Sequence, residues 1–180
     1  MCIKNKEVNA INKRQKKMVI LLLFICLSLF VVFKDCIPKI FVFNDSFSMP
    51  VGLYLIDRDD DYKVGDIVVV DPPQQIKNFM ITRGYLKEGN DLIKKIEGIE
   101  GDVYHTKNQS AYINAKYLGQ IYKVDSNKRP VPQFLGEHVI PKDYFLAIAD
   151  NRPNSFDSRY FGFLELKDIK YKVHPLLTFK

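Results

Sequence analysis

Two neighbouring serines, Ser46 and Ser48, are the residues whose type and spacing most directly suggest chemistry. They lie in the segment Asn44–Tyr54, which reads NDSFSMPVGLY. A serine hydroxyl attacks a carbonyl carbon only when a base takes its proton, so a nucleophilic serine needs a partner. None of the three histidines lies in the sequence setting of a Ser-His-Asp triad. A lysine can serve as the base instead, provided that its amine is uncharged.

The segment Leu92–Asp102, which reads LIKKIEGIEGD, contains two candidate bases, Lys94 and Lys95. If residues 91–96 form a strand, side chains alternate between its faces, and Lys94 shares one face with aliphatic neighbours on either side. Lys95 shares the other face with Glu97, which favours the charged form of its amine. Burial among apolar groups lowers the pKa of a lysine from its reference value of about 10.4. The pattern therefore favours Lys94 as the uncharged amine.

Further polar side chains follow in the segment Ala149–Gly162, which reads ADNRPNSFDSRYFG. Taken singly, each of the three segments has an ordinary structural interpretation. Ser-Met-Pro is typical of turns, Lys-Lys is typical of an exposed strand edge, and Asp-Asn-x-Pro is typical of a loop that hydrogen-bonds its own backbone. Asp157 and Arg159 could form a surface ion pair that contributes at most about 1 kcal/mol. The occurrence of all three segments in this order is what indicates a site.

The N-terminal part of the chain has a different character. Six of the first 17 residues are basic and one is acidic, and residues 18–33 form an uncharged apolar run, MVILLLFICLSLFVVF. As a helix at about 1.5 Å per residue, this run would extend roughly 24 Å, a little short of the ~30 Å hydrocarbon core of a bilayer. We expect a transmembrane anchor over 18–33, with the basic tail 1–17 in the cytoplasm and the remainder outside. A cleaved signal peptide is the alternative, and the lack of small residues over 34–38 favours an uncleaved anchor.

Beyond the anchor the sequence predicts one mainly β domain over residues 40–180. Short runs rich in β-branched and aromatic residues alternate with clusters of Gly, Pro, Asn and Asp, which is typical of a β-sandwich or barrel. No long amphipathic helical pattern and no internal repeat follows residue 33. The expected strands cover residues 51–56, 66–70, 79–83, 91–96, 102–106, 111–118, 143–149 and 169–175.

Composition and charge narrow the classes of partner. Hydrophobic residues make up 47% of the chain and aromatic residues 13%, enough for a packed core. The net charge of +6 comes mostly from the N-terminal tail, which argues against a nucleic-acid-binding face on the domain. Cys2, Cys26 and Cys36 all precede the domain, and the sequence has no HExxH motif, CxxC pair or Gly-rich phosphate loop. We therefore expect no nucleic-acid partner, no metal and no cofactor.

Together the three segments resemble the motifs of type I signal peptidases, which cleave peptides with a serine and a lysine. The third, D-N-R-x-N-S-x-D-S-R-Y-x-G, is the most specific of them. The resemblance implies a signal-peptidase-like β domain preceded by one N-terminal transmembrane helix. It also implies roles for individual residues: Ser48 as the nucleophile, Lys94 as the general base, Ser46 as a donor to the oxyanion, Ser155 as the hydroxyl that orients the lysine amine, Asp157 and Arg159 as a structural ion pair, and Asp150 as the partner of a basic residue, with Lys95 as the candidate.

Departures from the commoner signal peptidase pattern point to a subfamily. That pattern has an extra residue between Met and Pro, whereas Met49 and Pro50 are adjacent here. Ser-Met-Pro-x-Gly-x-Tyr resembles instead the TraF-type peptidases of conjugative transfer systems, which mature pilin precursors. Glu100 and Ala149 replace a usual proline and glycine without touching a catalytic group. An alanine in place of glycine restricts the backbone conformation, so the resemblance does not define the shape of the substrate-binding edges.

The TraF-type resemblance bears on substrate, partners and location. It favours a dedicated pilin-like precursor over general secretory preproteins, and it leaves both hydrolysis and head-to-tail cyclisation open. It implies a catalytic domain on the outer side of the inner or cytoplasmic membrane. There the domain would contact lipid, a precursor protein, and secretion or conjugation machinery.

Two further interpretations belong to other functional classes. A catalytically inactive, membrane-tethered β module could scaffold a secretion or conjugation assembly, although intact Ser48, Lys94, Ser46 and Ser155 argue for an enzyme. A self-cleaving repressor domain shares serine–lysine chemistry, but the anchor and the lack of a helix-turn-helix segment argue against it. The predicted function is therefore serine endopeptidase activity on exported precursors.

Overall fold

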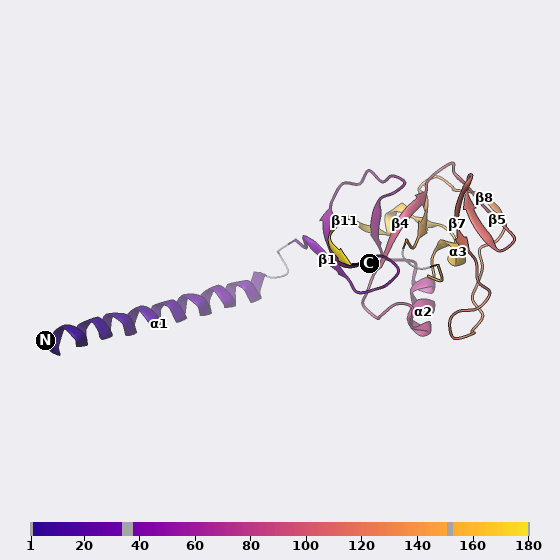
Figure 1. Cartoon of the computed structure of the whole chain (residues 1–180). Helices are drawn as coiled ribbons and strands as arrows, with labels where there is room; N and C mark the ends of the chain where they lie inside the picture. Colours follow the sequence, from indigo (N-terminus) through magenta and orange to yellow (C-terminus); the bar gives the residue numbers. More distant parts are fainter. Residues whose placement is uncertain (1, 34–37, 151–152, 180) are drawn as a thin grey trace. The chain divides into compact units, whose positions relative to one another are not determined.

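The computed structural model describes residues 2–33, 38–150 and 153–179. The chain divides into two compact units, residues 1–39 and residues 40–180. Figure 1 shows one long helix in the first unit and a domain of strands and short helices in the second. All of the residues predicted to carry chemistry belong to the second unit.

The first unit contains α1, which spans Cys2–Phe33. The helix includes both the basic tail and the apolar run, most of whose large apolar side chains are exposed. The predicted membrane-spanning anchor over 18–33 is not supported, since no helix among the described residues is long and apolar enough to cross a membrane. Residues 34–37, on which the choice between anchor and cleaved leader depends, lie outside the described part of the chain.

Among the residues that the structure describes, seven strands form the larger sheet of the domain, in the order β1-β2-β11-β3-β4-β9-β10. Every neighbouring pair in this sheet is antiparallel. The expected mainly β fold is therefore confirmed. The strands are β1 (Phe41–Asn44), β2 (Val51–Asp57), β3 (Ile67–Val70), β4 (Leu92–Gly98), β9 (Tyr144–Ile148), β10 (Leu164–Glu165) and β11 (Ile169–Phe179).

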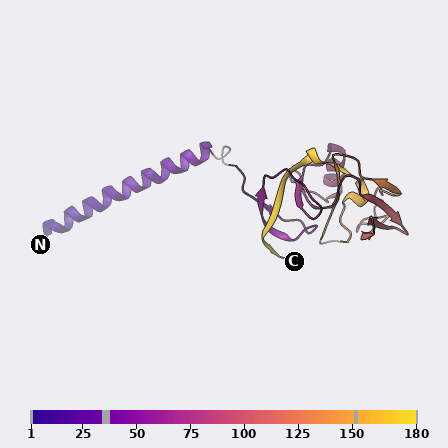
Figure 2. The same ribbon diagram turned by 90° about the horizontal axis from the view of Figure 1, so that it is seen from above.

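A second, four-stranded sheet has the order β7-β6-β5-β8, again with antiparallel pairs. It lies at the end of the domain away from β1 and β2, and Figure 2 shows the long strand β11, in yellow, running toward the C-terminus at the β1–β2 end. The strands of this sheet are β5 (Val103–Lys107), β6 (Ser110–Ile113), β7 (Lys116–Gln120) and β8 (Glu137–Val139). The helical elements are α2 (Gln74–Arg83), α3 (Ser158–Phe161) and η2 (Leu166–Asp168).

The predicted strand over 79–83 is wrong, because these residues form the second half of α2. Pro73 precedes the first helical residue, where a missing N–H costs nothing because the first N–H groups of a helix lack partners. Gly84 ends the helix in the left-handed conformation, with φ of 74°. Isoleucine and threonine near the end of α2 resemble strand composition. The proline and glycine at its two ends were the stronger signal.

The larger sheet buries side chains on both of its faces. The buried apolar side chains of the described residues form two clusters, and we call the larger one the main core cluster. Along β3 and β4, Val68 and Ile96 belong to the main core cluster, whereas Val69 and Ile93 belong to a second cluster. Alternation along each strand explains this division. The second core cluster consists of Met49, Tyr54, Val69, Ile93 and Val173. It therefore connects the loop between β1 and β2 to the centre of the sheet.

Candidate active site

The two serines lie in the loop that joins β1 to β2, which we call the serine loop (residues 45–50). The strands form an antiparallel hairpin in which Asn44 is opposite Gly52 at the base of the loop. Gly52 also pairs with β11 and has φ of 146°. A Cβ atom there would lie 2.1 Å from the carbonyl oxygen of Leu177, so glycine is needed for β11 to approach this closely. The glycine of Ser-Met-Pro-x-Gly-x-Tyr thus shapes the base of the serine loop.

The serine hydroxyls contact each other, with 3.1 Å between Ser46 Oγ and Ser48 Oγ. Ser48 is half-buried and Ser46 is exposed, so the pair lies at the surface of the domain. Met49 is fully buried in the second core cluster and fixes the loop to the sheet directly after Ser48. The Tyr54 hydroxyl donates a hydrogen bond to the Pro50 carbonyl at 2.6 Å. Ser48 is therefore accessible, yet its backbone is anchored.

Lys94 lies on β4 with only 2% of its surface exposed. Its neighbours on the same face, Leu92 and Ile96, belong to the main core cluster, as the alternation along the strand predicted. The Lys94 amine donates a hydrogen bond to Ser155 Oγ at 3.3 Å. Ser155 is itself buried, so the amine and its partner are both shielded from water.

The environment sets Lys94 apart from its neighbour Lys95. Burial lowers the pKa of Lys94 from 10.5 to about 8, against the opposing charge of Asp157 and with the help of the positive charge of Arg159. Burial acts in the same direction on the less buried Lys95, but nearby carboxylates, Glu97 first, outweigh it and raise the pKa of Lys95. Near pH 8 about half of the Lys94 amines are therefore uncharged, as a general base requires.

Asp157 and Arg159 form an ion pair inside the domain. The guanidinium donates from Nε and Nη2 to the two carboxylate oxygens, each at 2.8 Å. Exposure of the two side chains is 0% and 1%, so the interpretation of this pair as a surface ion pair is wrong. Asp157 also accepts from the N–H of Ala149 at 3.1 Å, and Arg159 donates to the carbonyls of Gln120 at 3.1 Å and Pro153 at 2.9 Å. The pair thus joins α3 to the ends of β9 and β7.

Asp150 lies on the surface, with its carboxylate 3.7 Å from the Lys95 amine. Lys95 is the basic neighbour that the sequence suggested for it. Burial raises the pKa of Tyr54 on β2, and the negative charge of Asp150 raises it further, against a hydrogen bond with Asn44. This coupling indicates that the third motif lies near the β1–β2 hairpin. Asn151 and Arg152 of the same motif lie outside the described residues.

The structure brings the predicted residues together in two groups, the serine pair and the lysine with its partners. Within the described part of the chain, Lys94 is hydrogen-bonded to Ser155, and no hydrogen bond joins it directly to Ser48. Met49, next to Ser48, packs with Ile93, next to Lys94, in the second core cluster, so the serine loop lies close to the backbone of β4. Ile93 and Lys94 point to opposite faces of the strand, so this packing does not itself bring the Ser48 hydroxyl to the Lys94 amine.

Two residues that hold the serine loop were not predicted as part of the site. Asn44 contacts the loop with both ends of its amide group, and Tyr54 binds the Pro50 carbonyl. Both residues lie at the ends of the NDSFSMPVGLY segment, so a signal was present in the sequence. Their partners are mostly backbone atoms, whose direction depends on the shape of the turn.

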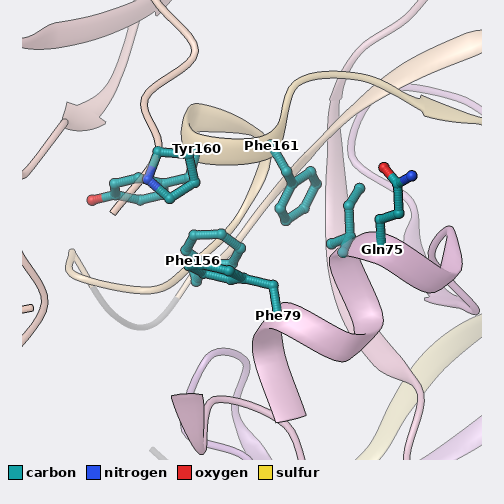
Figure 3. A pocket seen from close by; sticks show the side chains of 7 residues that line it. Gln75, Phe79, Phe156, Tyr160 and Phe161 are labelled. Atoms are coloured by element: carbon teal, nitrogen blue, oxygen red, sulfur yellow. The ribbon is translucent and has the colours of Figure 1, made fainter. Parts of the chain in front are cut away.

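A cavity of about 280 Å³ lies elsewhere, between α2 and α3 (Figure 3). Phe156 stacks on Phe79 across it, with ring centroids 5.2 Å apart. The cavity contains none of the predicted catalytic side chains, although Phe156 directly follows Ser155. In the described residues, no three His, Cys, Asp or Glu side chains gather as a metal site. The cavity is lined by Gln75, Ile76, Phe79, Pro132, Phe156, Tyr160 and Phe161.

Comparison with known proteins agrees with these motifs. The sequence model of the family described as "Signal peptidase, peptidase S26" matches residues 11–176. The chain belongs to this family. Signal peptidase I P of Bacillus subtilis subsp. natto is 29% identical over 116 residues, which cover 61% of this chain and 56% of that protein. The plasmid transfer protein TraF of Escherichia coli is 27% identical over 145 residues, which cover 75% of this chain and 81% of TraF.

The resemblance to signal peptidases, with the TraF type among them, is therefore confirmed. The chain spans about half the length of the signal peptidase I relatives that it matches, 56% and 59% in two of them. The crystal structure of a signal peptidase I from Enterococcus faecalis is also similar, in a match that covers 63% of this chain and 97% of the Enterococcus chain. That match has 21% identity and a TM-score of 0.38, which is too low to support an argument about the fold.

Proposed function

We propose that this member of the signal peptidase family is a serine endopeptidase that removes leader peptides from exported precursors with Ser48 and Lys94. The observation that carries the proposal is the buried Lys94 amine, whose pKa burial lowers to about 8. Strongly perturbed pKa values gather at functional sites, because catalytic bases must titrate near the working pH. Membership of the signal peptidase family indicates cleavage of a peptide bond as the reaction. Ser48 provides the hydroxyl and Lys94 the amine that this reaction needs.

In the proposed reaction, Ser48 Oγ attacks the carbonyl carbon of the scissile bond while the uncharged Lys94 amine takes the hydroxyl proton. The Ser48 side chain must first turn from Ser46, which its Oγ contacts at 3.1 Å, toward Lys94. The protonated Lys94 then gives its proton to the leaving amine, and the substrate acyl group remains as an ester on Ser48. Water attacks this ester, again with Lys94 as the base, and both side chains are restored.

Other side chains have supporting roles in this proposal. The Ser46 hydroxyl and the Ser48 backbone N–H would donate to the oxyanion of the tetrahedral intermediate, where negative charge develops. The Ser155 hydroxyl orients the lysine amine. Arg159, paired with Asp157, donates to the Ser155 carbonyl at 3.3 Å and so holds Ser155 in place.

The position of β1 suggests how a substrate binds. β1 is an edge strand of the larger sheet and leads directly into the serine loop. An extended peptide can add to such an edge as a further strand, with backbone hydrogen bonds supplying affinity. The similarity to a plasmid transfer protein favours a pilin-like precursor of conjugation over general preproteins. Either water or an amine of the substrate could resolve the acyl-enzyme, and the mass of the product distinguishes the two.

The proposal includes attachment of α1 to a membrane, with the β domain on the outer side. It is supported by the exposed apolar side chains of residues 18–29, which follow a basic segment. Extraction of cell membranes with alkaline carbonate tests this attachment. The full chain should stay in the membrane pellet, and release into the supernatant would overturn the attachment.

The catalytic proposal is tested by Ser48→Ala in the full chain. Wild type and variant are each incubated with a pilin precursor and with a secretory preprotein, and the products are weighed by mass spectrometry. Ser126→Ala, at an exposed serine in a loop, is the matched control and should cleave like wild type. Cleavage by wild type and control but not by Ser48→Ala is the expected result. Equal cleavage by all three chains would show that Ser48 is not the nucleophile, and no cleavage by any of them would favour an inactive scaffold.

A further inference from the structure

Asn44, the last residue of β1, has a polar side chain but only 4% of its surface exposed. Its amide nitrogen lies 3.1 Å from the carbonyl oxygens of Ser46 and Met49, and 3.0 Å from that of Pro50. Its amide oxygen accepts hydrogen bonds from the Ser46 N–H at 3.0 Å and from the Ser46 hydroxyl at 2.7 Å. One side chain therefore contacts both ends of the serine loop.

These contacts determine which way the Asn44 amide group faces. Carbonyl oxygens only accept hydrogen bonds, so the atom that faces three of them must be the nitrogen. The Ser46 N–H only donates, so the atom that faces it must be the oxygen. The orientation is thus fixed by four contacts that agree with one another, and the fifth, with the Ser46 hydroxyl, is compatible with it.

The same inventory places the hydroxyl protons. The Asn44 oxygen cannot donate, so the Ser46 hydroxyl proton points to it. Ser46 Oγ has then used its one proton, so in its contact with Ser48 it accepts and Ser48 donates. The result is a chain of hydrogen bonds that runs from Ser48 through Ser46 to Asn44. In this arrangement the proton of Ser48 points to Ser46.

We propose that Asn44 is a positioning residue that acts through Ser46, by holding its hydroxyl where it can turn from Asn44 to the oxyanion of the substrate. This inference rests on the proposed function. The Asn44 oxygen is a neutral acceptor, whereas the oxyanion is charged and forms the stronger hydrogen bond. The Ser46 hydroxyl therefore turns to donate its hydrogen bond to the substrate only as negative charge develops there, and it keeps its proton. The two N–H groups of Asn44, which face three loop carbonyls, keep the loop in place during this exchange.

The sharpest test is Asn44→Asp, made in the full chain with Ser46 intact and again together with Ser46→Ala. A carboxylate of the same size holds the Ser46 hydroxyl by a stronger, charge-assisted bond. We expect kcat to fall about 10–100-fold, with KM within about threefold, because an oxyanion donor is withheld. With Ser46→Ala there is no hydroxyl to hold, so the loss from Asn44→Asp should be at least about tenfold smaller.

This comparison separates positioning from structural damage. Any harm to the loop is present with and without the Ser46 hydroxyl, so it cancels in the ratio of the two losses. Equal losses in the two backgrounds would overturn the role through Ser46. The matched control is Asn114→Asp, because Asn114 holds a turn of the four-stranded sheet through Val103 N–H at 2.9 Å and Asp102 at 2.8 Å. It should leave kcat unchanged in both backgrounds.

The substrates are a pilin precursor and a secretory preprotein with a small-residue, Ala-x-Ala-like cleavage site. If Asn44→Asp does not fold, Asn44→Ala takes its place and should show the same inequality between backgrounds. Failure of both variants to fold, judged by circular dichroism, would overturn the specific role, since Asn44 would then be required for the fold. Failure of wild type to cleave either substrate would overturn the proposed function, and the role of Asn44 with it. Cleavage by wild type with equal losses overturns only the role of Asn44.

Discussion

The two halves of the candidate site are built in different ways. In the serine half, Ser48 is half-buried and Ser46 exposed, and hydrogen bonds from Asn44 and Tyr54 to the backbone hold their loop. In the lysine half, Lys94 lies inside the domain with 2% of its surface exposed. A buried ion pair and the main core, in place of a hydrogen-bonded loop, determine its surroundings.

The roles proposed for the two groups account for this difference. A nucleophile must reach the substrate and turn between partners, so it belongs on an accessible loop with a fixed backbone. A lysine must lose its charge before it can accept a proton, and the exclusion of water is the most direct way to lower its pKa. The comparison predicts that substitutions in the lysine half change stability and pH dependence, whereas those in the serine half change the placement of the hydroxyls.

Lys94→Met should give the largest effect on activity. It also tests most directly the difference between the lysine half and the serine half of the site. Without the amine, kcat/KM should fall by about 10⁴-fold or more, as for other residues that act as a catalytic unit. Stability should nonetheless rise, because a buried amine with a pKa near 8 costs about 3 kcal/mol relative to an unfolded lysine near 10.4. Cleavage assays and thermal unfolding at pH 7 check both parts, and a fall in Tm would contradict the second.

The pH dependence of that stability difference has a definite sign. The folded chain releases the Lys94 proton near pH 8, and the unfolded chain keeps it until about pH 10.4. Between these values the unfolded state binds more protons, so the stability of wild type rises with pH. The advantage of Lys94→Met should therefore be greatest below pH 8 and shrink toward pH 10. A constant advantage across this range would show that Lys94 titrates normally.

The buried ion pair offers the next largest effect, now on stability. Asp157→Asn and Arg159→Met each leave one buried charge unpaired, which should cost about 3–5 kcal/mol in the free energy of unfolding. Their effects on the pH profile should be opposite, because Asp157 raises the pKa of Lys94 and Arg159 lowers it. The midpoint of kcat/KM should move to lower pH in Asp157→Asn and to higher pH in Arg159→Met. Shifts in the same direction would contradict the assignment.

Replacement of a glycine by alanine can be made in both halves of the site, at Gly52 near the serine loop and at Gly119 beside Arg159. In Gly52→Ala the new Cβ would meet the Leu177 carbonyl at 2.1 Å, which is backbone and cannot move alone. In Gly119→Ala it would meet Arg159 Nη1 at 2.6 Å, at the end of a side chain. Both positions have positive φ, so both variants should lose stability, by about 1–3 kcal/mol from strain alone. Denaturant unfolding should show the greater loss for Gly52→Ala, and the reverse order would contradict this difference.

Tyr54→Phe should have the smallest effect. It removes the hydroxyl that donates to the Pro50 carbonyl and is hydrogen-bonded with Asn44, which together contribute about 1–2 kcal/mol to stability, and it leaves the ring in the second core cluster. Because Asn44 still donates to the same carbonyl, the serine loop should keep its shape and kcat should fall by less than about tenfold. Thermal unfolding and cleavage rates measure the two effects. A loss of kcat as large as that of Lys94→Met would assign Tyr54 a direct part in the chemistry.

The fold could be predicted from the sequence where strands are buried and regular. Alternation and β-branched residues indicated β3, β4, β9 and β11, which form the centre of the larger sheet. Strands β1, β8 and β10 were not predicted; all three are short and lie at the edges of their sheets, where few of their side chains are buried. The helix α2 was predicted as a strand at its end, because composition outweighed the proline and glycine that bound it.

The site could be predicted in part for similar reasons. A single acid two positions away was enough to favour Lys94 over Lys95 as the buried amine, since strand alternation separates their faces. The burial of Asp157 and Arg159 depends in part on Gln120, which lies far away in the sequence, so the residues alone left a surface pair possible and only the family resemblance implied a structural one. The part that Asn44 takes depends on where backbone carbonyls of the turn point, and no sequence pattern reports that.

A titration of the Lys94 side chain by NMR tests the central claim most directly. The full chain labelled with ¹⁵N-lysine is observed from pH 6 to 11, with Lys94→Met to assign the signal, and kcat/KM is measured on the same samples. An amine that loses its proton near pH 8, in step with a rise in kcat/KM, is the result expected from burial at this site. An amine that titrates near 10.4, with kcat/KM flat between pH 7 and 9, would contradict it.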